Sequence, residues 1–210
     1  MSLLNDIGFT AHVHFFQYND YLHPVEIAIS DVYSEKTFGT CVDAPYCSST
    51  YRDFDKNNYL SKYVHKVKFP PPKMGSLPLD KAEKYLKSHY LWLDRGRGQS
   101  LAVRGLSQKR FFQALGFRVV DVETDMFERD CTSLLNYRQE KLQPETSFNE
   151  SSNSIVFIND ESHRHRVHVS GDDSQCAGRL AAELANWIHK LKLDNFQDLT
   201  NKTLLKFNLL

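Results

Sequence analysis

The sequence of 210 residues predicts an α/β fold, in which helices flank a mixed sheet built from an antiparallel three-strand meander and additional parallel strands. Two patterns predict it. Three β-rich segments follow one another early in the chain and are joined by tight turns, which is typical of a meander. Beyond them, short apolar strands alternate with segments of helical periodicity, which is typical of parallel strands joined by helices. A hydrophobic content of 41% is sufficient for a core.

The meander is predicted from segments in which β-branched and aromatic residues dominate. Thr10–Tyr18 reads TAHVHFFQY, and the Asn19-Asp20 pair that follows favours a tight turn. Val25–Val32 is the second predicted strand and Lys36–Val42 is the third. Because both connections are short, consecutive strands are expected to run antiparallel.

Helical periodicity and helix-breaking residues predict the later elements. Ser107 is a suitable N-cap for a helix through Leu115, and Gly116 is suited to ending it. The other predicted elements are helices at 50–65, Leu79–His89, around 125–137 and Asp173–Lys192, and strands at Ser100–Val103 and Phe117–Val122.

The chain is expected to form one domain at residues 1–193, followed by a tail at 194–210. Residues 138–154 are polar and rich in Pro, Ser and Asn, so they predict a loop within that domain. Ile155–Ile158 is too short to assign from sequence. The sequence contains no apolar run of membrane-spanning length and no secretory signal, so we expect an intracellular protein, cytoplasmic or nuclear, without a membrane partner.

The net charge is zero at pH 7, but the charges are unevenly distributed. Residues 61–118 contain thirteen Lys and Arg against three Asp and Glu, whereas residues 119–162 contain three against ten. Two interpretations are open: a footprint for nucleic acid, or a solvated surface balanced by its acidic neighbour. The candidate nucleic-acid-binding residues are Arg95, Arg97, Arg104, Lys109 and Arg110, with Tyr90 and Trp92 nearby to stack on bases.

The most informative motif is His165-x2-His168-x7-Cys176, at the start of the last predicted helix. Imidazole and thiolate are usual ligands of tetrahedral zinc, and a helix start can hold the last of them rigidly. The same stretch contains His168-x4-Asp173, a spacing that offers a general base and a metal carboxylate from one helix. Two simpler interpretations remain beside these. Cys176 is also compatible with a small core residue, and Asp173 with an acid in the first helical turn.

The predicted order of elements is that of a ribonuclease-H-like (RNase H-like) sheet, and His168-x4-Asp173 makes the chain resemble DEDDh 3′–5′ exonucleases. Those enzymes hold two metal ions with four carboxylates, and a histidine activates the attacking water. In this chain the first strand reads HFFQ from His14 to Gln17, without a carboxylate, and Lys109 stands where the family places its central Asp. One remaining carboxylate cannot hold two Mg²⁺ ions. The resemblance therefore implies a domain that has lost this catalysis.

The chain also resembles the Maelstrom domains of the animal piRNA pathway, a degenerate branch of the same fold that carries a Glu-Cys-His-Cys set. Pro24–Ile27 (PVEI) matches their Pro-x-Glu-Ile strand, and the motif ending in Cys176 matches their Cys-x2-His-x7-Cys, with His165 in place of the first Cys. Histidine ligates zinc equally well. The resemblance implies a structural zinc cluster of Glu26, His165, His168 and Cys176. It also implies a role in RNA silencing or nucleic-acid metabolism, with single-stranded RNA or a protein as partner.

Other interpretations stay open at this point. Glu26 lies between two apolar residues, Val25 and Ile27, and its side chain points to the opposite face of the strand. It could therefore also be a solvent-facing residue of an edge strand. An active metal-dependent 3′–5′ exonuclease or RNase would need further acids, and Asp43, Asp172 and Asp173 are the candidates beside Glu26. A third interpretation is a purely structural scaffold for protein interactions, since a fold alone does not determine function.

Overall fold

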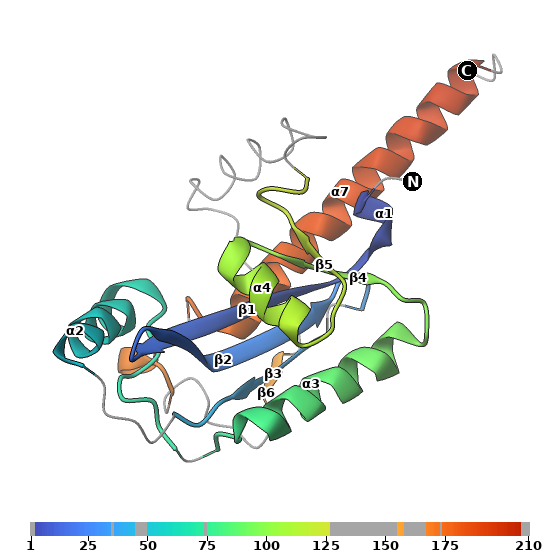
Figure 1. The fold of residues 1–210 in the computed structure, drawn as a ribbon. Coiled ribbons are helices and arrows are strands. Elements are labelled where there is room, and N and C mark those ends of the chain that lie inside the picture. Colours follow the sequence, from blue (N-terminus) through green and yellow to red (C-terminus); the bar gives the residue numbers. More distant parts are fainter. Residues whose placement is uncertain are drawn as a thin grey trace.

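The computed structural model describes residues 3–34, 36–44, 50–73, 75–126, 155–157, 167–172 and 174–206, with the backbone alone at 198–206. These residues form a six-stranded mixed sheet in the order β5-β4-β1-β2-β3-β6, flanked by helices (Figure 1). The strands are β1 (Ile7–Tyr18), β2 (Tyr21–Asp31), β3 (Thr37–Cys41), β4 (Ser100–Val103), β5 (Val119–Asp121) and β6 (Ile155–Phe157).

Strands β1, β2 and β3 form the predicted antiparallel meander. Asn19 and Asp20 connect β1 to β2 with φ angles of 49° and 65°, and two successive left-handed residues make a hairpin turn that matches the twist of the strands. The β1–β2 register shifts between His14 and Phe15, opposite Pro24. Proline cannot donate a ladder hydrogen bond, so the strand pairing is interrupted at Pro24 and the register shifts there.

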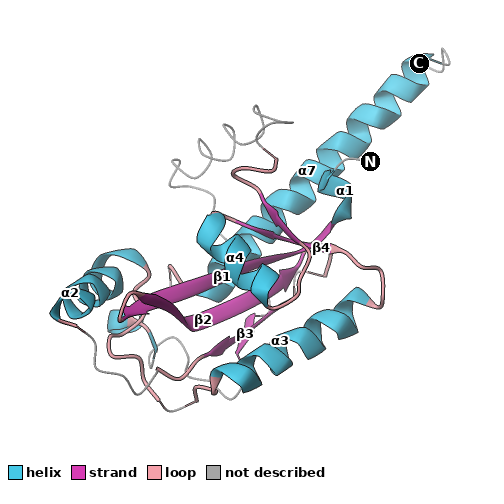
Figure 2. Cartoon of the chain, viewed as in Figure 1, coloured by secondary structure: helices cyan, strands magenta, loops and turns pink. Residues whose placement is uncertain are grey.

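Strands β4 and β5 extend the sheet on the β1 side, and β6 extends it on the β3 side, all in parallel pairings. The predicted mixed sheet is therefore confirmed, and its order and directions agree with an RNase H-like arrangement. Figure 2 shows the strands as one twisted layer with helices packed around it.

The sequence between these strands forms helices of very different lengths. They are α1 (Leu3–Asp6), α2 (Tyr51–Tyr59), α3 (Leu79–Asp94), α4 (Leu106–Ala114) and α7 (Ala177–Lys206), with a π-helical turn at Leu60–Val64 and a 3₁₀ turn at Val169–Gly171. Helix α2 begins with a reciprocal cap between Thr50 and Asp53. Asp53 Oδ2 also accepts from Asn19 N, which fixes α2 to the β1–β2 turn. None of the helices in the described part of the chain has both the length and the apolar character required to cross a membrane.

The two faces of the sheet are covered by different helices. On one face, Phe9 of β1 belongs to an apolar cluster with residues of α3 and α4. On the other face, Thr10 Oγ1 donates to Ala181 O of α7 at 2.6 Å, and Ala28 of β2 packs on Ala177 and Ala181. Alternate residues of a strand point to opposite faces, so each strand contributes to both cores. In Figure 1, α4 accordingly lies in front of β1 while α7 passes behind it.

Two helix boundaries on the α3–α4 face differ from the predicted ones. Helix α4 begins at Leu106 with Gly105, and not Ser107, at the N-cap position. Gly105 has a φ of 91°, which suits glycine, and its amide donates to Asp121 Oδ1. Helix α3 continues beyond its predicted end to Asp94, because Tyr90 keeps the apolar stripe of the helix in the core.

Helix α7 also departs from the predicted boundaries. It begins at Ala177 and continues beyond Lys192 to Lys206, so most of the segment predicted as a tail is helical. Figure 1 shows its C-terminal half extending past the sheet. Residues 127–154, which include most of the helix predicted around 125–137 and the loop predicted at 138–154, lie outside the described part of the chain.

Candidate metal centre

Glu26 lies in the middle of the sheet, on the face covered by α7. It belongs to β2, where it is paired with His14 of β1 on one side and Cys41 of β3 on the other. Its side chain is 0% exposed, so the interpretation of Glu26 as a solvent-facing residue of an edge strand is wrong. A buried carboxylate requires hydrogen-bond donors or a cation close to it.

The start of α7 approaches β2 closely because small residues line the contact. Ala177 packs on Ala28 of β2. A Cβ at Gly178 would lie 2.8 Å from a side-chain carbon of β6, so a larger residue there would force the helix and the strand apart. The close approach brings Cys176, immediately before the helix, to the carboxylate of Glu26.

His168 comes from a short segment that precedes α7. It forms an isolated antiparallel bridge with Val67, and the amide of Val169 donates to Lys66 O at 2.7 Å. This bridge holds the segment against the chain that leads into α3. The His168 side chain is 0% exposed and points into the same interior as Glu26.

Glu26, His168 and Cys176 meet in one buried group. Glu26 Oε1 lies 3.2 Å from His168 Nε2 and accepts a hydrogen bond of 3.2 Å from Cys176 Sγ. The amide of Ala177 donates to Glu26 Oε2 at 3.1 Å. One potential ligand atom from each of the three side chains lies within 4.8 Å of the other two. Three of the four residues predicted to meet are therefore observed together, and this group could bind a metal ion.

Burial sets the protonation of the Cys176 thiol. It raises the pKa of Cys176 well above its usual value, and the negative charge of Glu26 raises it further. Without a cation beside it, Cys176 is therefore a protonated thiol that donates to Glu26. A bound Zn²⁺ would displace that proton, because the thiolate is the form that ligates metal.

Two further histidines, His14 and His65, stack beside this group. His14 Nε2 lies 2.6 Å from Gln175 O and 3.7 Å from Glu26 Oε2, and its ring centroid lies 4.8 Å from that of His65. Burial lowers the pKa of both imidazoles, that of His65 to about 3, so both are neutral near pH 7. Neither His14 nor His65 is among the site residues predicted from sequence. The pattern His12-x-His14 could have indicated His14, because residues two apart on a strand share one face.

A cavity of about 330 Å³ lies next to these histidines, between β1, α4 and α7. Its lining includes His12, Gln108, Arg104 and Glu123. Among its described lining residues Glu123 is the one carboxylate, and it is neutralised by Arg104, whose Nη2 lies 3.1 Å from Glu123 Oε1. Strand β1 thus presents two imidazoles, those of His12 and His14, to this cavity.

Of the acids proposed for an active nuclease, the described ones (Glu26, Asp43 and Asp172) do not form one group. Asp43 and Asp172 lie outside the three-residue group, and the described residues form no other group of three potential ligands that meets the same distance limit. Asp172 Oδ1 instead accepts from Ser174 N at 3.0 Å. His165 and Asp173 lie outside the described residues.

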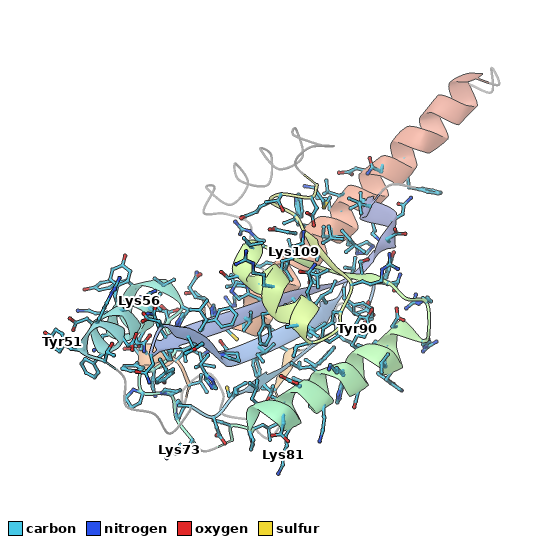
Figure 3. The ribbon with its side chains drawn as sticks, viewed as in Figure 1. Tyr51, Lys56, Lys73, Lys81, Tyr90 and Lys109 are labelled. Atoms are coloured by element: carbon cyan, nitrogen blue, oxygen red, sulfur yellow. The ribbon has the colours of Figure 1, made fainter. Side chains whose placement is uncertain are left out.

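The five basic candidates lie in different environments. Lys109 on α4, labelled in Figure 3, has its Nζ 2.7 Å from Asp125 Oδ1, and Arg104 is paired as described above. These two pairs join the basic segment to the acidic one, which is what a balanced, solvated surface would show. Arg95 and Arg97 instead line a second cavity at the end of α3. Arg110 is exposed on α4.

The two aromatic candidates on α3 also differ. Tyr90 is buried, its ring packs on Phe9 and Phe117, and its hydroxyl donates to Gln99 O at 2.5 Å. Its ring belongs to the core and is not free to stack on a base, contrary to the expectation from sequence. Trp92, two residues further along the same helix, is 68% exposed.

Comparisons with known proteins do not assign the chain to a family. No model of a known protein family matches it, and a search of curated proteins finds no significant match. Two features of the molecule bear on its function: the RNase H-like order of the sheet and the buried group formed by Glu26, His168 and Cys176.

Proposed function

We propose that this chain is a non-catalytic RNase H-like domain, similar to Maelstrom domains, that binds zinc at Glu26, His168 and Cys176 and also binds single-stranded RNA. The zinc ion is structural and ties β2 to the start of α7. His165 supplies the fourth ligand, in agreement with the His-x2-His-x7-Cys spacing. The domain acts in RNA silencing or a related step of nucleic-acid metabolism.

The zinc proposal is carried by the burial of three ligand-type side chains around one point. Glu26 and His168 are 0% exposed, and Cys176 is 4% exposed. A carboxylate, an imidazole and a thiol form a donor set suited to Zn²⁺ and not to Mg²⁺, which prefers oxygen ligands. The amide of Ala177 holds the Glu26 carboxylate in place, so binding would require little rearrangement of the strand.

The absence of nuclease activity is supported by the chemistry of the cavity over β1. Two-metal nucleases require several carboxylates, because oxygen ligands hold both ions. The β1 residues that line this cavity are His12 and His14, and the Glu123 carboxylate is engaged by Arg104. Imidazoles are poor ligands for Mg²⁺, which prefers oxygen ligands.

A metal-free clamp is the second candidate, and the hydrogen bonds of the group favour it. Cys176 Sγ, Ala177 N and His168 Nε2 all lie within hydrogen-bond distance of the Glu26 carboxylate. Donors at these distances can stabilise a buried carboxylate without a cation. In this alternative the same residues join β2 to α7, and the purified protein contains no stoichiometric metal.

Elemental analysis of the purified protein, paired with an RNA titration, tests the proposal. We expect about one zinc per chain, as in other structural sites. We expect binding of a short oligouridylate to weaken steeply between about 50 mM and about 200 mM salt, because phosphate contacts release counterions. The same RNA should remain intact in Mg²⁺ or Mn²⁺.

Each part of the proposal can fail separately. A chain without zinc would favour the metal-free clamp. Cleavage that is lost in Asp173→Ala would establish the nuclease alternative. A chain that binds no RNA even at low salt would leave a protein as the partner.

A further inference from the structure

A second cavity, of about 460 Å³, lies at the C-terminal end of α3 and shares no lining residue with the cavity beside the histidines. Its described lining comes from two parts of the chain: the end of β2 and the connection to β3 contribute Asp31, Tyr33, Ser34 and Lys36, and the end of α3 and the residues after it contribute Trp92, Leu93, Arg95 and Arg97. In Figure 3, Lys81 and Tyr90 mark the two ends of this helix, and the cavity belongs to the Tyr90 end. Its volume falls in the range of about 300–1,000 Å³ that is usual for ligand pockets.

The lining of this cavity combines positive charge with exposed aromatic rings. Lys36, Arg95 and Arg97 contribute three cations, and Trp92 and Tyr33 are 68% and 48% exposed. Proteins bind single-stranded nucleic acids with this combination, because aromatic faces stack on bases while cations contact the phosphates.

Tyr33 is fixed in the cavity wall before any ligand arrives. Lys192 Nζ of α7 lies 2.6 Å from the Tyr33 hydroxyl and 4.8 Å from its ring centroid. The ring also lies 6.2 Å, between centroids, from His189. The carboxylate of Asp31 accepts from Tyr33 N at 2.7 Å, which fixes the backbone of the turn. A preformed wall reduces the entropy lost when a ligand binds.

Arg97 and Arg95 differ in what they already bind. Arg97 Nε donates to Asp94 O and its Nη2 donates to Leu93 O, so the guanidinium covers the end of α3. In the described part of the chain, no carboxylate pairs with Arg95. Among the described lining residues the one carboxylate is that of Asp31, which is buried and accepts from the turn amides of Tyr33 and Ser34. The Arg95 guanidinium is therefore better placed than that of Arg97 to contact a phosphate group.

We propose that this cavity binds one nucleotide unit of a single-stranded nucleic acid, with the base stacked on Trp92 and the phosphate held by Arg95. Lys36 and Arg97 add positive charge around the phosphate. An acidic peptide would satisfy these cations but would leave the Trp92 face uncovered. Duplex nucleic acid is unsuitable, because its bases are already stacked on both faces. The inference rests on the RNA-binding part of the proposed function and is independent of zinc.

A titration of the full chain with a short oligouridylate, followed by tryptophan fluorescence, tests the stacking contact. The chain contains two tryptophans, and Trp187 is buried, so quenching of the exposed Trp92 reports a base on its face. Trp92→Ala lacks this reporter, so its affinity is measured by fluorescence anisotropy of a labelled oligouridylate, and it should weaken binding roughly tenfold, which is the effect expected for one lost base–aromatic stack. Leu91→Ala is the matched control, since Leu91 is exposed on the same helix and does not line the cavity.

A salt titration tests the phosphate contact. Arg95→Gln should reduce the slope of log affinity against log salt by about 0.7, which is the value for one phosphate contact on a single strand. Lys87→Gln, an exposed cation of the same helix outside the cavity, should leave the slope unchanged.

The outcomes separate this site from the rest of the proposed function. Quenching by an oligothymidylate of equal length supports recognition of base and phosphate alone, and quenching by RNA alone supports a further contact to the 2′-hydroxyl. Equal quenching by duplex RNA would overturn the stacking model. Parental affinity in both Trp92→Ala and Arg95→Gln would overturn the site while leaving RNA binding intact. A parent that binds no single strand would overturn both.

Discussion

The buried group at Glu26 and the exposed cavity at Trp92 are built in opposite ways. In the buried group, polar side chains contact each other: Glu26 meets His168 and Cys176, each at 3.2 Å. In the cavity, Trp92 is 68% exposed, and none of the ion pairs between described residues includes Arg95. Substitutions in the first region should therefore change folding stability, whereas substitutions in the second should change binding and leave stability near that of the parent.

The largest expected effect is on melting temperature, in Cys176→Ala and His168→Ala. Loss of a zinc ligand removes folding free energy, because the site is assembled only in the folded chain. A loss of ~2 kcal/mol would lower the melting temperature by roughly 4–8 °C for a domain of this size. Differential scanning calorimetry of the zinc-loaded proteins measures the change.

Thr10→Ala provides a matched control for these two variants. Thr10 is buried and also ties the sheet to α7, through its hydrogen bond to Ala181 O. Its loss should lower stability by about 1 kcal/mol and leave the zinc content unchanged. Unchanged melting of both ligand variants, in protein that contains zinc beforehand, would contradict a structural clamp.

The fourth ligand can be identified by comparing three variants. We expect His165→Ala to weaken zinc affinity by more than the roughly 10–100-fold typical of an outer-shell residue. His14→Gln and Cys41→Ala should have smaller effects, although both residues are paired with Glu26 across the sheet. Competition with a zinc chelator measures the affinities. If His14→Gln releases zinc and His165→Ala retains it, then His14 is the ligand.

The pH dependence of stability should report the buried histidine stack. Burial lowers the pKa of His65 from 6.5 to about 3, so the unfolded chain binds the additional proton between these values. Stability from neutral His65 is present above pH 6.5 and is lost as the pH falls toward 3. The lowered pKa of His14 acts in the same direction.

A variant at His65 checks this assignment. Urea unfolding of the parent should show lower stability at about pH 5 than at about pH 7, and His65→Phe should reduce that difference. Phenylalanine keeps ring contacts with Phe16 and His14, whose centroids lie 4.9 and 4.8 Å from His65. An equal pH dependence in the parent and in His65→Phe would assign the effect to other groups.

The smallest expected effects come from the cations that are already paired. Arg104→Gln and Lys109→Gln should each change RNA affinity by less than about twofold, because Glu123 and Asp125 neutralise these charges in the parent. Fluorescence anisotropy with the same oligouridylate compares them with Arg95→Gln. A loss as large as that of Arg95→Gln would place RNA on α4 as well.

Local patterns predicted those features that depend on neighbouring residues. The Asn19-Asp20 turn follows from the left-handed preference of its two residues, and Ser100–Val103 was predicted with the bounds it has in the structure. The convergence of His168 and Cys176 followed from their spacing at the start of α7. The link to Glu26 came from a family resemblance, because no spacing connects a residue of β2 to a helix 150 residues later.

Features that depend on distant contacts could not be predicted in this way. Gly105, and not Ser107, occupies the N-cap position of α4, where its amide donates to Asp121, sixteen residues away. Likewise, the charge of Lys109 is neutralised by Asp125, which a count of charges along the chain cannot show. Tyr90 and Trp92 are two residues apart on one helix, and only the observed packing tells which of them is buried.

X-ray absorption at the zinc edge, on the purified parent and on Cys176→Ser, tests the central claim most directly. The proposed site predicts about one zinc per chain, with one sulfur at about 2.3 Å and the remaining nitrogen and oxygen ligands at about 2.0–2.2 Å. In Cys176→Ser the sulfur contribution should disappear. Protein with only trace zinc, or a zinc shell without sulfur in the parent, would contradict the claim that Glu26, His168 and Cys176 hold a metal ion together.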